Sequence, residues 1–154
     1  NDGQIDRAIG LTEQALASGE AMSPPLHQTL LANLASYLLL RGRVTEAVSQ
    51  ALQALNIMIR FDYNHAQPWA LERGALVAWR LGRHGLARSL AGLAQRLLDA
   101  GQIRRAAAER EIHLQLSTGL TGMNEPEQRV ELADALLILR AFYEEVLAAE
   151  ATRR

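Results

Sequence analysis

Four histidines are the residues of this chain best suited to hold a metal ion or transfer a proton, and they are His27, His65, His84 and His113. They do not have the spacing of metal ligands, either with one another or with a carboxylate on the same predicted helix face. Cysteine is absent, which excludes a thiolate site, a cysteine nucleophile and a disulfide. The sequence therefore predicts structural or solvated histidines, no metal site and no cofactor.

A second candidate for chemistry is the segment STGLTGMNEPE, residues 117–127, whose glycines and threonines precede a predicted helix. The N-terminus of a helix suits a phosphate group in general. This segment has no Lys, no GKS or GKT ending and no preceding strand, so it lacks the requirements of a phosphate-binding loop. We interpret it as a linker.

Carboxylates are frequent along the last predicted helix, and they are Glu127, Glu131, Asp134, Glu144, Glu145 and Glu150. Their neighbours indicate an exposed stripe, and a run of charges on a surface helix is usually a solvated face. No nucleophile, base and orienting group come together by any spacing in the chain. The sequence therefore predicts no catalytic residue and a protein that is not an enzyme.

The charges of the 154-residue chain are nearly balanced, with a net charge of -1 and no lysine. Interspersed charges of both signs argue against a binding surface for nucleic acid or an anionic membrane. No apolar run reaches the roughly 18 residues of a membrane span, and the N-terminus lacks the pattern of a signal peptide. We expect a soluble, cytoplasmic segment with no direct nucleic-acid binding and no membrane contact.

Leu and Ala dominate the chain and no strand-length alternation occurs, so we predict an all-α fold of about seven helices. Ser23 before two prolines suits a helix start. Asn124 and Glu127 have capping-box spacing and should open the last helix. The predicted helices span residues 4–18, 25–41, 44–60, 67–81, 84–99, 102–117 and 125–150.

Four similar segments predict an internal repeat: GQIDRA at residue 3, GRVTEA at 42, GRHGLA at 82 and GQIRRA at 101. Each begins with a glycine where a helix should end, and an alanine follows five residues later. Short turns favour antiparallel helix pairs that stack. We therefore expect one domain, a right-handed α-solenoid over residues 1–118, followed by a linker and a long C-terminal capping helix over 119–154.

Residues 30–55 resemble a tetratricopeptide repeat, with the pattern residues Leu31, Asn33, Leu34, Ala35, Leu38, Gly42, Ala47, Ala51 and Ala54. The buried set of this unit should also include Leu55. Residues 71–94 show the pattern more weakly, with Leu71, Gly74, Ala75, Ala78, Gly82, Ala87, Ala91 and Ala94. The resemblance covers about residues 1–118.

The period of about 40 residues is longer than the family's usual 34 and is similar to the helical repeats of large bacterial transcription and signalling regulators. This resemblance implies a noncatalytic module that binds a protein or peptide, or senses an inducer, within a multidomain bacterial regulator. The first unit begins at its turn and second helix, and Asn1 is not an initiator Met. We therefore expect that the chain is part of a longer protein.

The resemblance also implies where a ligand would bind, because one stripe of each first helix lines the concave groove in this family. In residues 67–81 that stripe is Trp69, Glu72, Leu76 and Trp79, flanked by Arg73 and Arg80, and the preceding first helix contributes Ser36 and Leu39. Trp and Arg suit peptide recognition. The alternative is that the tryptophans fill gaps between adjacent units.

The last predicted helix is apolar around more of its circumference than a single stripe. One seam is Leu132, Leu136, Leu139, Tyr143 and Val146, and a second set is Val130, Leu137, Ile138 and Ala141. We expect this helix to cap the solenoid and to contribute to a homodimer or an interdomain contact. The competing function is a structural oligomerisation scaffold without a ligand, whose groove would be filled by its own chain.

Overall fold

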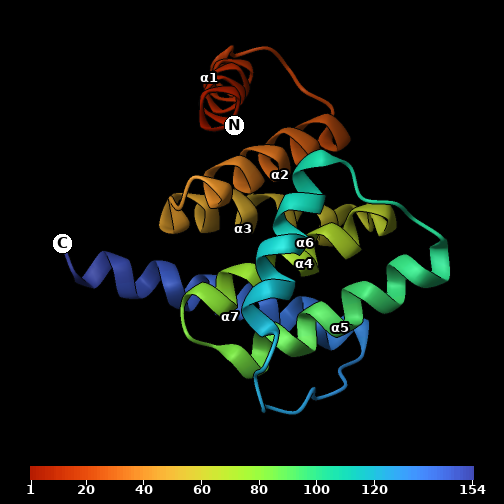
Figure 1. The fold of residues 1–154 in the computed structure, drawn as a ribbon. Coiled ribbons are helices and arrows are strands. Elements are labelled where there is room, and N and C mark those ends of the chain that lie inside the picture. The colour runs from red at the N-terminus through yellow and green to blue at the C-terminus, as the bar shows by residue number, and fades with distance from the viewer. The chain divides into compact units, whose positions relative to one another are not determined.

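The computed structural model describes residues 1–154 and contains seven α-helices and no β-strand (Figure 1). The prediction of an all-α chain is confirmed. No helix combines the length and the apolar composition that crossing a lipid bilayer requires. A short 3-10 turn, Asn64–Ala66, precedes the fourth helix. The α-helices are α1 Asp2–Ala17, α2 Pro24–Leu40, α3 Val44–Phe61, α4 Gln67–Arg80, α5 His84–Gly101, α6 Ala107–Leu120 and α7 Leu132–Thr152.

The chain forms two compact units whose borders differ from the division predicted at residue 118. The first unit holds residues 1–64 and 140–154, which are α1, α2, α3 and the later turns of α7. The second unit holds residues 65–139, which are α4, α5, α6 and the beginning of α7. Each unit is therefore built around one helix pair joined by a short turn, α2 with α3 and α4 with α5.

The start of α1 shows why the first of the four glycine markers is wrong. The Asn1 side-chain oxygen accepts hydrogen bonds from the backbone N–H groups of Gly3 and Gln4, at 3.0 and 3.4 Å. This N-cap begins the helix at Asp2, so Gly3 lies inside α1 and not in a turn. Helix α2 begins at Pro24, one residue before the predicted start, with Ser23 in the cap position as expected but without a capping hydrogen bond from its side chain.

The turns after α2 and α4 have the same backbone geometry forty residues apart. Gly42 and Gly82 are left-handed, with φ of 77° and 78°. In the first turn the N–H of Arg43 donates to the carbonyl of Leu38 at 2.9 Å, and in the second the N–H of Arg83 donates to Ala78 at 2.7 Å. A residue with a Cβ is strained at such a φ, which is why glycine occupies both positions. The period predicted between these two markers is confirmed.

The period continues at residues that the sequence markers did not include. Gly122, forty residues after Gly82, is left-handed with φ 80°. Asp62 and Gln102, again forty residues apart, are left-handed with φ of 54° and 52° and end α3 and α5. Gly101 is the last residue of α5, so the marker GQIRRA names the wrong residue of its turn.

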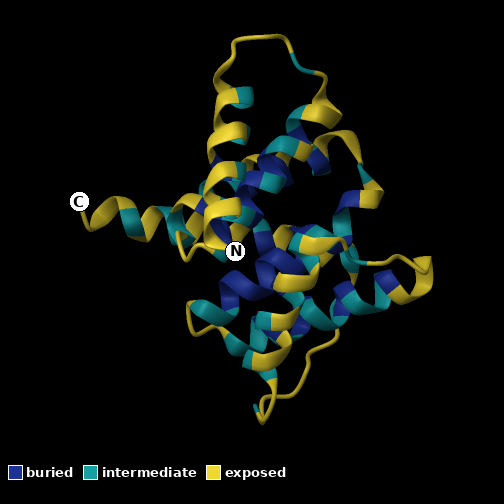
Figure 2. Ribbon diagram, turned by 45° about the horizontal axis from the view of Figure 1, so that its top comes forward, coloured by how far each residue is buried: buried dark blue, intermediate teal, exposed yellow.

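The core of the first unit lies between α2 and α3, where the eight side chains predicted to be buried have exposed fractions of at most 6%. By contrast, α1 is exposed along most of its length (Figure 2). Its Leu16 packs against Leu31, Ala32 and Ala54 of the pair. The buried set is Leu31, Leu34, Ala35, Leu38, Ala47, Ala51, Ala54 and Leu55.

The core of the second unit is centred on α4, whose residues from Ala70 to Ala78 are all buried. Gly74 lets α7 come close, because a Cβ at this position would collide with the side chain of Leu139. On α5, Ala87, Leu90 and Ala94 are fully buried. A helix buried on all sides needs covering elements beyond its own partner helix, and α6 is one of them.

Helices α6 and α7 begin later than predicted, α6 at Ala107 and α7 at Leu132. Asn124 therefore does not cap α7. Side chains of α5 hold the preceding loop instead: one Arg88 nitrogen donates to the carbonyls of Leu120 and Met123, at 3.1 and 2.9 Å. One turn further on, Gly92 leaves room for the Glu127 carboxylate, and in the next turn Arg96 pairs with Glu127.

Candidate functional site

The stripe predicted to line a groove on α4 is largely closed. Glu72 and Leu76 are buried, with exposed fractions of 3% and 0%, and Arg73 is buried as well. The two tryptophans, Trp69 and Trp79, are half-buried. The stripe is therefore part of the interior of the second unit for most of its length.

Helix α6 covers the C-terminal end of this stripe, around Trp79 and Arg80. Gly119 faces the indole of Trp79 so closely that a Cβ at residue 119 would collide with the ring. One helix turn earlier on α6, Gln115 accepts a hydrogen bond from the guanidinium of Arg80. Burial lowers the pKa of Arg80 from its ordinary value, because the charged form is less well solvated there. At this end, the predicted groove is filled by the chain itself.

Glu72 forms an ion pair inside the second unit. Its two carboxylate oxygens accept from the Nε and Nη2 atoms of Arg105, at 2.9 and 2.7 Å. The same Nη2 donates to Gln95 at 2.7 Å, and Nδ1 of His113 lies 3.7 Å from the carboxylate. The hydrogen bond to Glu72 raises the pKa of Arg105. This network connects α4 to the segment before α6, and Arg105 is a residue that the sequence interpretation did not select.

The two predicted groove residues of α2 are also interior residues. Ser36 and Leu39 have exposed fractions of 3% and 1%. The hydroxyl of Ser36 donates to the carbonyl of Ala32 at 3.1 Å, one turn back in its own helix. A serine whose hydroxyl is satisfied in this way needs no ligand.

The apolar residues predicted for an oligomer contact lie at the surface. Leu137 and Ile138 have exposed fractions of 50% and 42%, Ala141 is exposed and Val130 is half-buried. Val130 and Ile138 line a hollow of the second unit together with Leu86 and other residues of α5. The exposed side chains of Leu137 and Ile138 are therefore available to contact another surface.

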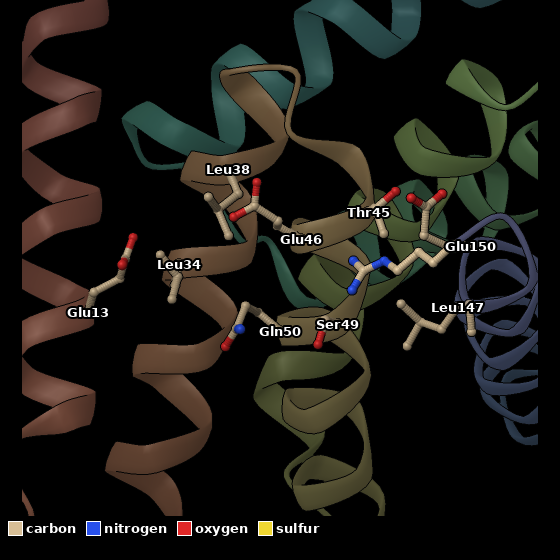
Figure 3. A pocket seen from close by; sticks show the side chains of 11 residues that line it. Glu13, Leu34, Leu38, Thr45, Glu46, Ser49, Gln50, Leu147 and Glu150 are labelled. Carbon is tan, nitrogen blue, oxygen red and sulfur yellow. The ribbon is translucent and has the colours of Figure 1, made fainter.

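A different hollow, of about 540 Å³, lies in the first unit among α1, α2, α3 and the last turns of α7 (Figure 3). Leu34 and Leu38 form its apolar floor on α2, and Leu147 of α7 adds to it. The polar lining comes from four segments. It consists of Glu13, Thr45, Glu46, Ser49, Gln50, Glu150 and Arg154, and Ala151 completes the lining.

The lining of this hollow is acidic, with three carboxylates and one guanidinium. Glu46 accepts hydrogen bonds from Arg43 at 2.9 and 2.6 Å, which lower the pKa of Glu46. The same bonds raise the pKa of Arg43, and the charges of Glu13 and Asp6 raise it further. Glu150 of α7 lies 3.8 Å from Arg153, which directly follows the helix. Glu13 makes no close ion pair, and its charge acts on the guanidinium of Arg43 from a distance.

The hollow was not found from the sequence because its residues have no common spacing. Glu13, Glu46 and Glu150 lie on three different helices, and only the folded first unit brings them to one place. The arrangement offers carboxylate, hydroxyl and amide groups beside leucine side chains. A lining of this composition is chemically suited to a ligand with an apolar part and a cationic part, and it contains no nucleophile paired with a base.

No group of three or more histidine, aspartate or glutamate side chains has the arrangement of a metal site. The comparisons with protein-family models, with curated proteins and with solved structures find no match to this chain.

Proposed function

We propose that the chain is a noncatalytic interaction module, a tetratricopeptide-like right-handed solenoid from a multidomain bacterial regulator of transcription. The repeated turn supports the solenoid, because Gly42 and Gly82 end equivalent helices with equivalent hydrogen bonds. The pattern in residues 30–55 supports the family. The regulator rests on the length of the repeat alone, and the full gene product tests it: an attached ATPase, DNA-binding or cyclase domain supports it, and an isolated repeat domain contradicts it.

The observation that carries the interaction function is the hollow of the first unit. Its lining places the half-buried Leu147 beside carboxylate, hydroxyl and amide side chains, above the buried Leu34 and Leu38. The predicted stripe on α4 is closed, so we place the binding of a peptide segment in this hollow. In tetratricopeptide-like proteins, helices supply the binding surface and no chemistry is required.

A displayed library of random peptides tests this function directly. We compare peptides enriched by the wild-type chain with those enriched by Thr45→Phe, which fills the hollow, and by Thr118→Phe, which adds the same side chain to an exposed position of α6. Peptides that bind the wild type and Thr118→Phe, and fail to bind Thr45→Phe, support the proposal. Enrichment that is equal for all three chains, or absent, contradicts it.

The second candidate is an oligomerisation scaffold, favoured by the exposure of Leu137 and Ile138 and by the cover that α6 places over Trp79. A scaffold should self-associate through α7. Sedimentation velocity of the wild type and of Leu137→Arg measures this. A wild-type dimer that dissociates in the variant supports the scaffold, and a monomeric wild-type chain contradicts it.

A further inference from the structure

We infer that the hollow of the first unit binds an arginine side chain of the partner peptide, next to an apolar residue, and that the chain's own Arg154 competes for the same place. This inference rests on the proposed function, since it names the chemistry of the peptide that the hollow would accept. Four features of the hollow support it: its charge, its apolar side, its size and the presence of Arg154.

The charge of the lining favours a cation. Glu13, Glu46 and Glu150 contribute three negative charges, and Arg154 contributes the only positive charge among the lining residues. Arg43 already pairs with Glu46 and Arg153 lies 3.8 Å from Glu150, so Glu13 is the lining carboxylate without an ion-pair partner. An anionic ligand would meet repulsion from Glu13, whereas a cation would be attracted to it and to the weakly paired Glu150.

The floor of the hollow favours a long side chain over a small cation. Leu34 and Leu38 lie beneath the hollow and are each only 3% exposed. Leu147 is half-buried beside them. An arginine can lay its methylene groups on the accessible surface of Leu147 while its guanidinium reaches a carboxylate, and a free metal ion or ammonium cannot. The guanidinium fork also matches two carboxylate oxygens, as the Arg43 to Glu46 pair shows in this unit.

The size of the hollow accommodates more than one side chain. Its volume of about 540 Å³ falls in the usual range for small-ligand sites. This volume is larger than one arginine side chain needs. Thr45, Ser49 and Gln50 line the same hollow on α3 and offer hydrogen-bond partners to a peptide backbone. We therefore expect an apolar residue of the peptide next to its arginine.

Arg154 is the one lining residue of the hollow that has the same side chain as the inferred ligand. It lies just after α7, is exposed, and makes no ion pair of its own, although the hollow that it lines holds three carboxylates. An incoming arginine must share these carboxylates with it. Removing the Arg154 charge should therefore strengthen binding, and this sign distinguishes a competitor from a supporting residue.

The experiment uses the dipeptide acetyl-Leu-Arg-amide as the probe and acetyl-Leu-citrulline-amide as its uncharged control of nearly equal shape. Titration into the ¹⁵N-labelled full chain, followed by NMR, reports shifts of the amides of Thr45, Ser49 and Gln50. We expect saturable shifts there with the arginine probe and none with the citrulline probe. Equal shifts with both probes, or shifts that lie elsewhere, overturn the inference.

Variants of the lining give the second arm. Glu150→Gln should weaken binding of the arginine probe about two- to fivefold, as expected for one carboxylate near the surface. Glu144→Gln, on the same helix and outside the hollow, should leave it unchanged. Arg154→Gln should strengthen it by a similar factor. Equal weakening by Glu150→Gln and Glu144→Gln, or weakening by Arg154→Gln, contradicts the inference.

The failure of this inference and the failure of the proposed function give different results. If the library enriches peptides that bind the wild type but not Thr45→Phe, and these peptides lack a basic residue, the interaction function is supported and the inferred binding of arginine is contradicted. If neither the library nor the dipeptide depends on the hollow, both proposals fail.

Discussion

Gly119 is the residue that lets α6 cover α4, and its substitution tests that cover. A Cβ at residue 119 would collide with the Trp79 ring, so in Gly119→Ala either the ring moves or α6 shifts outward. Overpacking of this kind costs about 1 to 3 kcal/mol. The substitution also gains up to about 1 kcal/mol of helix propensity. Gly10, in the middle of α1, is the matched control, because no atom lies within 4 Å of the Cβ that alanine would add there.

We expect Gly10→Ala to raise the free energy of unfolding by about 1 kcal/mol. Gly119→Ala should be less stable than Gly10→Ala by about 1 to 3 kcal/mol, the overpacking penalty alone. Urea unfolding followed by circular dichroism measures both. In a chain that already carries Trp79→Leu, Gly119→Ala should lose most of this penalty, because the smaller side chain leaves room for the new Cβ. The comparison is with Trp79→Leu alone. An equal gain in the two alanine variants would refute the closed stripe.

Arg105→Met should cost about 3 kcal/mol, because it leaves the buried Glu72 carboxylate without its partner, and replacing both residues by Met should recover most of this loss in urea unfolding. Ala87→Leu should cost about 1 to 3 kcal/mol in the same assay, and a change below about 0.5 kcal/mol would place Ala87 at the surface. Because the hydrogen bond from Arg43 lowers the pKa of Glu46, its stabilising effect is present at neutral pH and is lost as the pH falls through that lowered pKa. In Arg43→Ala this pKa should rise to its ordinary value in an NMR titration, and an unchanged pKa would contradict the pairing.

The parts of the fold that depend on local sequence could be predicted. The turns at Gly42 and Gly82 follow from a residue type that tolerates a left-handed backbone, and the buried alanines follow from helical periodicity. The turn after α5 was misplaced by one residue, because Gln102 takes the left-handed conformation although its residue type does not favour it. Neighbouring residues do not reveal such an exception.

The beginnings of α6 and α7 could not be predicted, because contacts with distant residues determine them. Arg105 is held by Glu72, which lies 33 residues earlier, and Met123 is held by Arg88, 35 residues earlier. The same limit applies to the candidate sites. A stripe on one helix is visible in the sequence, but the helix that covers Trp79 and the hollow that collects Glu13 with Glu150 are visible only in three dimensions.

Five of the six left-handed residues recur every twenty positions, at Gly42, Asp62, Gly82, Gln102 and Gly122, and the sixth, Gly19, lies 23 positions before Gly42. An in-frame gene duplication of a forty-residue block between residues 42 and 122 would therefore join a helix end to the same kind of turn that it already has. A duplication of another length would misalign the turns with the buried faces of the helices that they join. Such a chain can lengthen during evolution in whole steps of one helix pair, while every junction keeps a backbone conformation that its neighbours already tolerate.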